Sequence, residues 1–111
     1  MTTNNHEVII AIVNSGFAEV AMEVARSCGA RGGTILNARG VVGEEAAAFF
    51  GITLHAEKEM LMIVVDKTIR DEILNALYKQ MDKKSQTFAF SLPVSDVAGL
   101  MAAEKTEEKA E

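Results

Sequence analysis

At 111 residues, with 49% hydrophobic residues and a formal net charge of −5, the chain has the size and composition of one small globular domain. The acidic balance argues against a nucleic-acid-binding protein, which normally carries a basic patch, and the single cysteine excludes an intrachain disulfide and a cysteine-based zinc site. The polar N-terminus lacks the pattern of a signal peptide, and no apolar run approaches the roughly 18 residues that span a bilayer, so we expect a cytoplasmic protein.

The first predicted elements are a strand and a helix. Residues 7–13, EVIIAIV, are rich in β-branched residues and too short for a typical helix, which predicts a buried strand. An Asn-Ser-Gly turn follows. Apolar residues then recur at helical spacing from Phe17 to Cys28. This spacing predicts an amphipathic helix with Val20 on its buried face and Gly29 as its C-terminal stop.

The rest of the chain predicts three more strands and a second long helix. The strands are expected at residues 33–38, 59–65 and 87–92. Thr68-Ile69-Arg70-Asp71 has the form of a capping box with Asp in place of Glu or Gln, so Thr68 is expected to cap a helix that follows from Ile69. Between the second and third strands lies a loop with a possible short helix from Glu44 to Phe50.

The order strand–helix–strand occurs twice, which predicts a ferredoxin-like α+β fold of the βαββαβ type. In this arrangement two helices cover one face of an antiparallel sheet, and the other face needs a cover, which favours an oligomer. We expect one domain over residues 1–100. Residues 101–111 form an acidic, alanine-rich tail that we interpret as flexible.

The residue types that usually carry catalysis do not form an evident set. His6 and His55 flank strands and are interpreted as solvated rather than as metal ligands. Cys28 lies on the apolar side of the predicted helix, which favours a buried, inert thiol. The adjacent pair Glu44 and Glu45 is interpreted as a solvated loop pair. We therefore expect neither an enzyme nor a metal site.

The segment GARGGTILNARG, residues 29–40, allows two interpretations. Its glycines could simply form turns on either side of a strand. Alternatively, backbone N–H groups in those turns could bind an anion, with Arg31 and Arg39 adding charge-assisted hydrogen bonds to phosphate. The segment is neither a P-loop nor a dinucleotide-binding fingerprint. On spacing alone, turns are the favoured interpretation.

Several blocks of the chain together resemble the PII signal-transduction family. These blocks are the strand ending Ala-Ile-Val at residue 13, the segment from Gly32 to Gly40, the strand ending Ile-Val-Val at residue 65, and Leu92-Pro93-Val94-Ser95-Asp96. The resemblance implies a homotrimer that binds adenine nucleotides in clefts between subunits and controls transporters, enzymes or regulators through a T-loop.

The resemblance also implies roles for individual residues. Ile12, Gly32, Thr34 and Val64 match positions around the adenine, Gly40 matches the glycine that opens the T-loop near the phosphates, and Lys58 matches the lysine that meets 2-oxoglutarate. With the glycine-segment residues, the ligand-binding candidates are Ile12, Arg31, Gly32, Gly33, Thr34, Arg39, Gly40, Lys58 and Val64. In the loop, Phe49, Phe50 and Ile52 are partner-facing candidates, or else they fold back onto the trimer.

The chain also departs from the usual PII pattern. The loop from Val41 to Glu57 is shorter and contains neither tyrosine nor glutamine. Ser85-Gln86 stands where the family has Gly-Lys, and Ala98-Gly99-Leu100 stands where arginines are expected. These departures argue against ATP–Mg–2-oxoglutarate sensing of the usual kind. They favour a PII-like protein with a shortened T-loop that takes ATP, ADP, AMP or a related ligand. The alternative is a structural or divalent-cation-related trimer of the same fold that binds no nucleotide.

Overall fold

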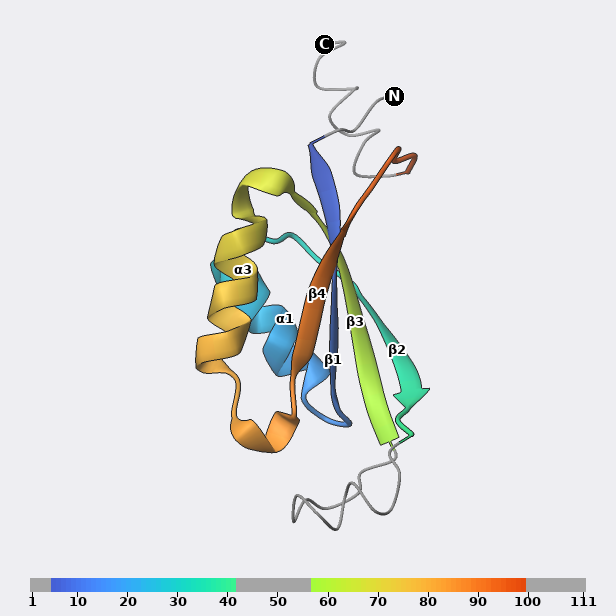
Figure 1. Ribbon diagram of the computed structural model, residues 1–111, viewed down its shortest axis with the longest axis vertical. Helices are drawn as coiled ribbons and strands as arrows, with labels where there is room; N and C mark the ends of the chain where they lie inside the picture. The colour runs from blue at the N-terminus through green and yellow to red at the C-terminus, as the bar shows by residue number, and fades with distance from the viewer. Residues whose placement is uncertain (1–4, 42–56, 100–111) are drawn as a thin grey trace.

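The computed structural model describes residues 5–41 and 57–99. The elements follow in the order β1 (His6–Asn14), α1 (Ala18–Ser27), β2 (Thr34–Arg39), β3 (Glu57–Asp66), α3 (Lys67–Gln80), a 3-10 turn η1 (Lys83–Ser85) and β4 (Phe88–Pro93). The four strands form one antiparallel sheet in the order β2-β3-β1-β4, and both helices lie on the same side of it (Figure 1). The predicted ferredoxin-like α+β fold is confirmed.

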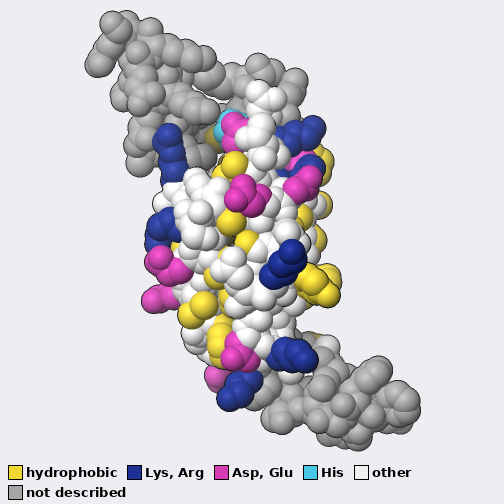
Figure 2. Space-filling view, turned by 90° about the vertical axis from the view of Figure 1, so that its left-hand side faces the viewer, with side chains coloured by type: hydrophobic (Ala, Val, Ile, Leu, Met, Phe, Trp, Pro, Cys, Tyr) yellow, Lys and Arg dark blue, Asp and Glu magenta, His cyan; other side chains and the backbone are white. Residues whose placement is uncertain are grey.

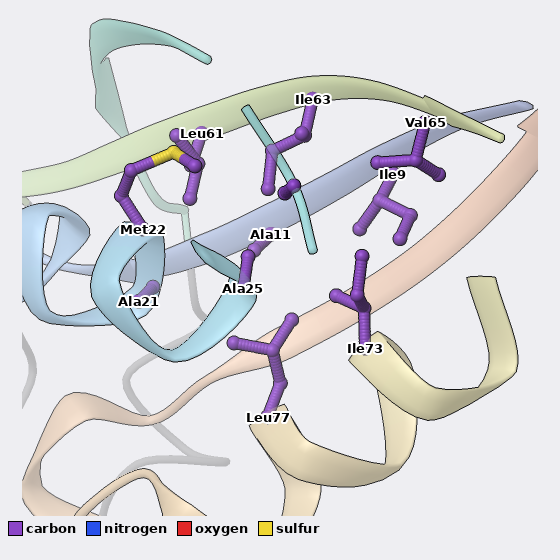
Figure 3. Packing of buried hydrophobic residues seen from close by; sticks show 11 residues of the cluster. Ile9, Ala11, Ala21, Met22, Ala25, Leu61, Ile63, Val65, Ile73 and Leu77 are labelled. Carbon is purple, nitrogen blue, oxygen red and sulfur yellow. The ribbon is translucent and has the colours of Figure 1, made fainter. Parts of the chain in front are cut away.

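The covered face of the sheet, against which the helices pack, holds the hydrophobic core. Side chains from β1 and β3 point toward Ile73 and Leu77 of α3 and toward the alanines and Met22 of α1 (Figure 3). Alternation along the strands produces this layer, because every second residue of β1 is buried. The core residues are Ile9, Ala11, Ala21, Met22, Ala25, Ala30, Leu61, Ile63, Val65, Ile73 and Leu77.

Helix α1 packs against the sheet with a narrower buried face than the spacing of its apolar residues predicts. Its buried residues are Ala18, Ala21, Met22 and Ala25. The expectation that Val20 is buried is wrong, because its side chain is 50% exposed. Alanines have no side-chain atoms beyond Cβ, so this side lets the helix lie close to the strands, which would not be possible with valine at the contact.

The ends of α1 are fixed by different parts of the chain. At its C-terminal end, Gly29 N–H donates to Arg26 O (3.0 Å) and Ala30 N–H donates to Ala25 O (3.1 Å). Gly29 has a φ of +111°, so this is the Schellman arrangement that the glycine predicts. At its N-terminal end, Glu59 of β3 accepts from Gly16 N–H and Ala18 N–H, both at 3.0 Å. The cap is therefore supplied by a strand that lies far along the chain.

Helix α3 begins two residues before the predicted start. Its N-cap is Asp66, whose Oδ1 accepts from the backbone N–H of Thr68 (3.1 Å) and from its hydroxyl (3.0 Å). The predicted capping box between Thr68 and Asp71 is wrong, because the Asp71 carboxylate instead accepts from Arg70 Nε (2.9 Å). An N-cap needs an extended backbone, which Asp66 has at the end of β3.

An ion pair joins α3 to the covered face. Arg70 Nη1 lies 3.1 Å from Glu7 Oε2. Glu7 belongs to β1 and is only 7% exposed. Hydrogen bonds to Asp71 and to Glu7 raise the pKa of Arg70 above its ordinary value, so the guanidinium remains charged. Because Glu7 is nearly buried, removing its partner would leave an uncompensated carboxylate.

Two sequence-based interpretations of polar residues are corrected by their surroundings. His6 Nδ1 is buried with no hydrogen-bond partner among the described residues, so His6 is not simply solvated. Cys28 is only partly buried, because it lies at the C-cap of α1, where its Sγ is 3.9 Å from Glu72 O. His55, Glu44 and Glu45 lie outside the described residues, as do the possible short helix and the acidic tail.

Candidate functional site

Among residues 5–41 and 57–99, no helix lies on the opposite face of the sheet, which we call the open face (Figure 1). Its residues follow from the strand registers. They are His6, Val8, Ile10, Ile12 and Asn14 on β1; Thr34, Leu36 and Ala38 on β2; Lys58, Met60, Met62, Val64 and Asp66 on β3; and Phe88, Phe90 and Leu92 on β4. Large apolar side chains on it are exposed: Leu36 (42%), Met62 (37%), Phe88 (63%) and Leu92 (47%).

The adenine candidates share this open face. Ile12 pairs with Met60, Thr34 pairs with Met62, and Val64 pairs with Val8. Gly32 lies in the exposed segment that enters β2. The structure therefore brings Ile12, Thr34 and Val64 onto one apolar surface, and the pairing of β1 with β3 and of β3 with β2 is what unites them.

Gly33 has a packing role that its place in a glycine-rich segment did not reveal. A Cβ there would lie 2.9 Å from the backbone oxygen of Met62, 3.0 Å from Leu61 Cδ1 and 3.1 Å from Met22 Sδ. Only glycine lets the chain pass this close to β3 and α1. Gly32 differs, because a Cβ at that residue would have nothing within 4 Å. Of the two, Gly33 is required by the fold, whereas Gly32 borders open space.

The charged candidates lie at the other end of β2. Arg39 closes that strand opposite Glu57 and is exposed, and Gly40 follows it. Lys58 lies one residue further along β3, opposite Ala38. Arg31, by contrast, is exposed in the segment between α1 and β2. Because β2 is six residues long, roughly 20 Å of strand separates the ends where the two arginines lie. Within one chain Arg31 and Arg39 do not meet.

Lys58 is held by a network that the sequence did not suggest. Its Nζ donates to Asn14 Oδ1 (2.6 Å) and to Gln86 Oε1 (3.1 Å). Asn14 Nδ2 in turn donates to the carbonyl of Lys84 in η1 (2.7 Å). The three side chains of Lys58, Asn14 and Gln86 form what we call the polar row, at the end of the open face where β3 begins.

The first three residues of β3 are all bonded to the turn between β1 and α1 or to its neighbours. Glu57 O accepts from Ser15 N–H (3.2 Å), Lys58 contacts Asn14, and Glu59 caps α1. Sequence reasoning missed Asn14, Gln86 and Glu59, since their partners lie 28 to 70 residues away along the chain. The one signal in the sequence was Asn14 at the end of an apolar strand, because an amide that becomes buried there needs hydrogen-bond partners.

In the part of the chain that the structure describes, no three His, Cys, Asp or Glu side chains gather as a metal-binding group. No helix in residues 5–41 or 57–99 is both long and apolar enough to cross a membrane. The partner-facing candidates Phe49, Phe50 and Ile52 lie outside the described residues.

A protein-family model described as Nitrogen regulatory protein P-II matches residues 6–104. The chain belongs to the P-II family. The match extends over all seven described elements, so the resemblance drawn from separate sequence blocks is confirmed. P-II proteins are signalling regulators, and this sets the class of function. No curated protein sequence matches the chain.

Solved structures of P-II proteins share the fold. A PII-like signalling protein from Thermus thermophilus is 20% identical, with a TM-score of 0.66 over 90% of this chain and 93% of that one. Arabidopsis thaliana PII, bound to citrate, is 22% identical, with a TM-score of 0.65 over 89% and 83% of the two chains. CPII from Thiomonas intermedia, bound to ADP, AMP and bicarbonate, is 14% identical, with a TM-score of 0.63 over 86% and 96%.

Proposed function

We propose that this P-II family chain is a cytoplasmic, non-enzymatic regulator that assembles as a homotrimer and binds an adenine nucleotide in the clefts between subunits. The nucleotide state is passed to a partner, a transporter or a metabolic enzyme, through the short loop that carries Phe49, Phe50 and Ile52. Binding shifts the population of loop conformations that the partner recognises.

The exposed apolar side chains of the open face are the main support for the proposed trimer. An isolated chain would leave the apolar residues of four strands in water, including Phe88 and Leu92 at 63% and 47% exposure. Monomeric proteins rarely present an apolar surface that extends across a whole sheet. Packing of the open faces of several copies against one another buries these side chains. This arrangement agrees with the trimer that the family implies.

The distribution of polarity on the open face supports nucleotide binding. Ile12 and Val64, with Thr34 on the same face, suit the base, and the polar row at the opposite end of the open face suits phosphate. Arg39 lies at that same end of β2, on the other face of the strand. CPII, which shares the fold, has been captured with ADP and AMP. In this chain Arg39 replaces part of the charge that the missing family lysine and arginines would supply.

Calorimetry with ATP, ADP and AMP, each with and without Mg²⁺ and 2-oxoglutarate, tests the proposal. We expect saturable binding of at least one nucleotide and no requirement for Mg²⁺ with 2-oxoglutarate. Light scattering should give the mass of three chains. A trimer that binds no nucleotide would favour the alternative, a structural or divalent-cation-related trimer, and a monomer would contradict the proposed assembly.

Arg39 should contribute directly to the affinity for the phosphate. We expect Arg39→Ala to weaken nucleotide binding by about 1.5–3 kcal/mol, the range for a hydrogen bond to a charged group. Lys79→Ala is the matched control, because Lys79 is an exposed cation on α3, away from the open face. Equal affinity of the Arg39 variant and the wild type would remove Arg39 from the site.

A further inference from the structure

Lys58 stands alone as a cation on the open face. Of the described residues that the strand registers place there, it is the single lysine or arginine. Its two hydrogen-bond acceptors, Asn14 Oδ1 and Gln86 Oε1, belong to neutral amides. No carboxylate in residues 5–41 or 57–99 forms an ion pair with it. The hydrogen bonding of this ammonium group is therefore largely satisfied, while its charge is not neutralised.

The two acceptors are held very differently. Asn14 is 5% exposed, and its amide is fixed from both ends, by Lys58 on one side and by Lys84 O on the other. Gln86 is exposed and holds Lys58 through one longer bond, of 3.1 Å. Gln86 is thus the replaceable partner of Lys58, and Asn14 is the fixed one.

The backbone of Gln86 adopts a conformation that is unfavourable for glutamine. It has φ 51° and ψ 47°, in the left-handed region, and it is the one described non-glycine residue with positive φ. Glycine adopts this conformation without strain, whereas glutamine does not. The bond from Lys58 offsets part of this unfavourable conformation.

We propose that Gln86 is a specificity-determining residue, whose side-chain amide competes with an anionic oxygen of the ligand for the Lys58 ammonium. A phosphate or carboxylate oxygen makes a stronger, charge-assisted bond to an ammonium than a neutral amide does. An anionic ligand can therefore displace Gln86, but it binds more weakly than it would to an unoccupied lysine. Asn14 keeps the ammonium in position throughout the exchange.

For nucleotides the inference rests on the function proposed above, and it predicts a preference for few phosphates. Four residues of β3, about 13 Å, separate Met62 beside Thr34 from Lys58. With the base on the apolar positions, the phosphate chain extends toward the polar row. AMP then reaches Lys58 less well than ADP does, so the competition from Gln86 weakens ADP binding more than AMP binding.

Substitutions at Gln86 change this competition in both directions. Gln86→Gly removes the amide and suits the left-handed backbone, so it should fold at least as well as the wild type. Gln86→Glu places a carboxylate on Lys58 and strengthens the competitor. Lys83→Gln is the control, because it removes a charge from the same turn without touching Lys58. Circular dichroism and light scattering establish that the variants keep the wild-type fold and assembly.

The measurement is the ratio of the Kd for AMP to the Kd for ADP, together with the thermal shift given by pyrophosphate and by succinate. Gln86→Gly should raise the ratio about five- to tenfold, the effect of exchanging a neutral for a charged hydrogen bond, and Gln86→Glu should lower it. Lys83→Gln should leave it within about twofold, as expected for a screened surface charge. The pyrophosphate and succinate arms show whether a free phosphate or a free carboxylate alone suffices.

The two proposals can fail separately. If the wild type binds neither AMP nor ADP, the proposed nucleotide function is wrong, and the pyrophosphate and succinate shifts still test Gln86. Larger shifts in Gln86→Gly than in the wild type, and smaller ones in Gln86→Glu, support the competition. The same response to every probe in the wild type and both Gln86 variants overturns it.

Discussion

The two faces of the sheet are built from similar residues but have different surroundings. On the covered face, Ile9, Leu61 and Ile63 are fully buried under the helices. On the open face, the next residues along the same strands, such as Ile10 and Met62, are only partly covered in the single chain. The apolar character of the open face thus matches that of the core, although no described element of the chain packs against it. A sheet face that is apolar but uncovered is typical of a surface at which subunits associate, whereas a surface that faces solvent is more polar.

The helix side of the molecule shows what a true solvent surface looks like in this protein. There, Lys, Arg, Asp and Glu side chains of both signs are interspersed around a narrow apolar band (Figure 2). A mixed, charged surface of this kind favours solubility. The contrast between the helix side and the open face supports self-association through the open face.

The largest expected effect on stability comes from one of two neighbouring residues of β3 that lie on opposite faces of the sheet. Ile63→Ala should lower the free energy of unfolding by about 2–5 kcal/mol, because it opens a cavity in the closed core. Met62→Ala, one residue away and 37% exposed in the single chain, should instead weaken self-association. Urea denaturation and light scattering over a range of protein concentrations separate the two effects. Equal loss of assembly in both variants would contradict the distinction between the faces.

A second pair of variants compares the adjacent glycines that lead into β2. Gly33→Ala should destabilise the fold by about 1–3 kcal/mol, because its Cβ would clash with the Met62 backbone and with Leu61 on the covered face. Gly32→Ala meets nothing within 4 Å and should leave stability nearly unchanged. Thermal unfolding measures both. A loss of nucleotide affinity in a stable Gly32→Ala variant would place Gly32 at the ligand, and a wild-type melting temperature for Gly33→Ala would disprove its packing role.

The smallest effect concerns the cap that β3 provides for α1. Glu59→Ala removes the carboxylate bonded to Gly16 N–H and Ala18 N–H, and it should cost about 1 kcal/mol, as for other N-cap losses. Glu57→Ala is the control, because the contact of Glu57 with Ser15 is made by its backbone oxygen. Chemical denaturation of the two variants should show a loss only for Glu59. The same loss in both would mean that net charge, rather than capping, is responsible.

Local sequence patterns predicted most of the fold. The run EVIIAIV became β1, which extends one residue further at each end, and Gly29 ended α1 as its position indicated. These features depend on alternation, helical spacing and backbone freedom, all of which act over a few residues. The side of α1 that faces the sheet was mispredicted at Val20, because the closeness of approach to the strands depends on tertiary packing.

The candidate site was predictable only in part. Ile12, Thr34 and Val64 were named through the family resemblance, and strand pairing places them on one face. The bonds that Lys58 makes to Asn14 and Gln86 could not have been predicted, because sequence spacing carries no signal for contacts 44 and 28 residues apart.

By itself, the sequence determined the order of strands and helices, the turn at Gly29 and membership of the P-II family, because these follow from short-range patterns and conformational preferences. Only the tertiary structure decided which apolar residues are covered, that Gly33 rather than Gly32 is needed for packing, and that Lys58 already has partners. The physical reason is that burial and side-chain hydrogen bonds depend on which distant segments the sheet brings together.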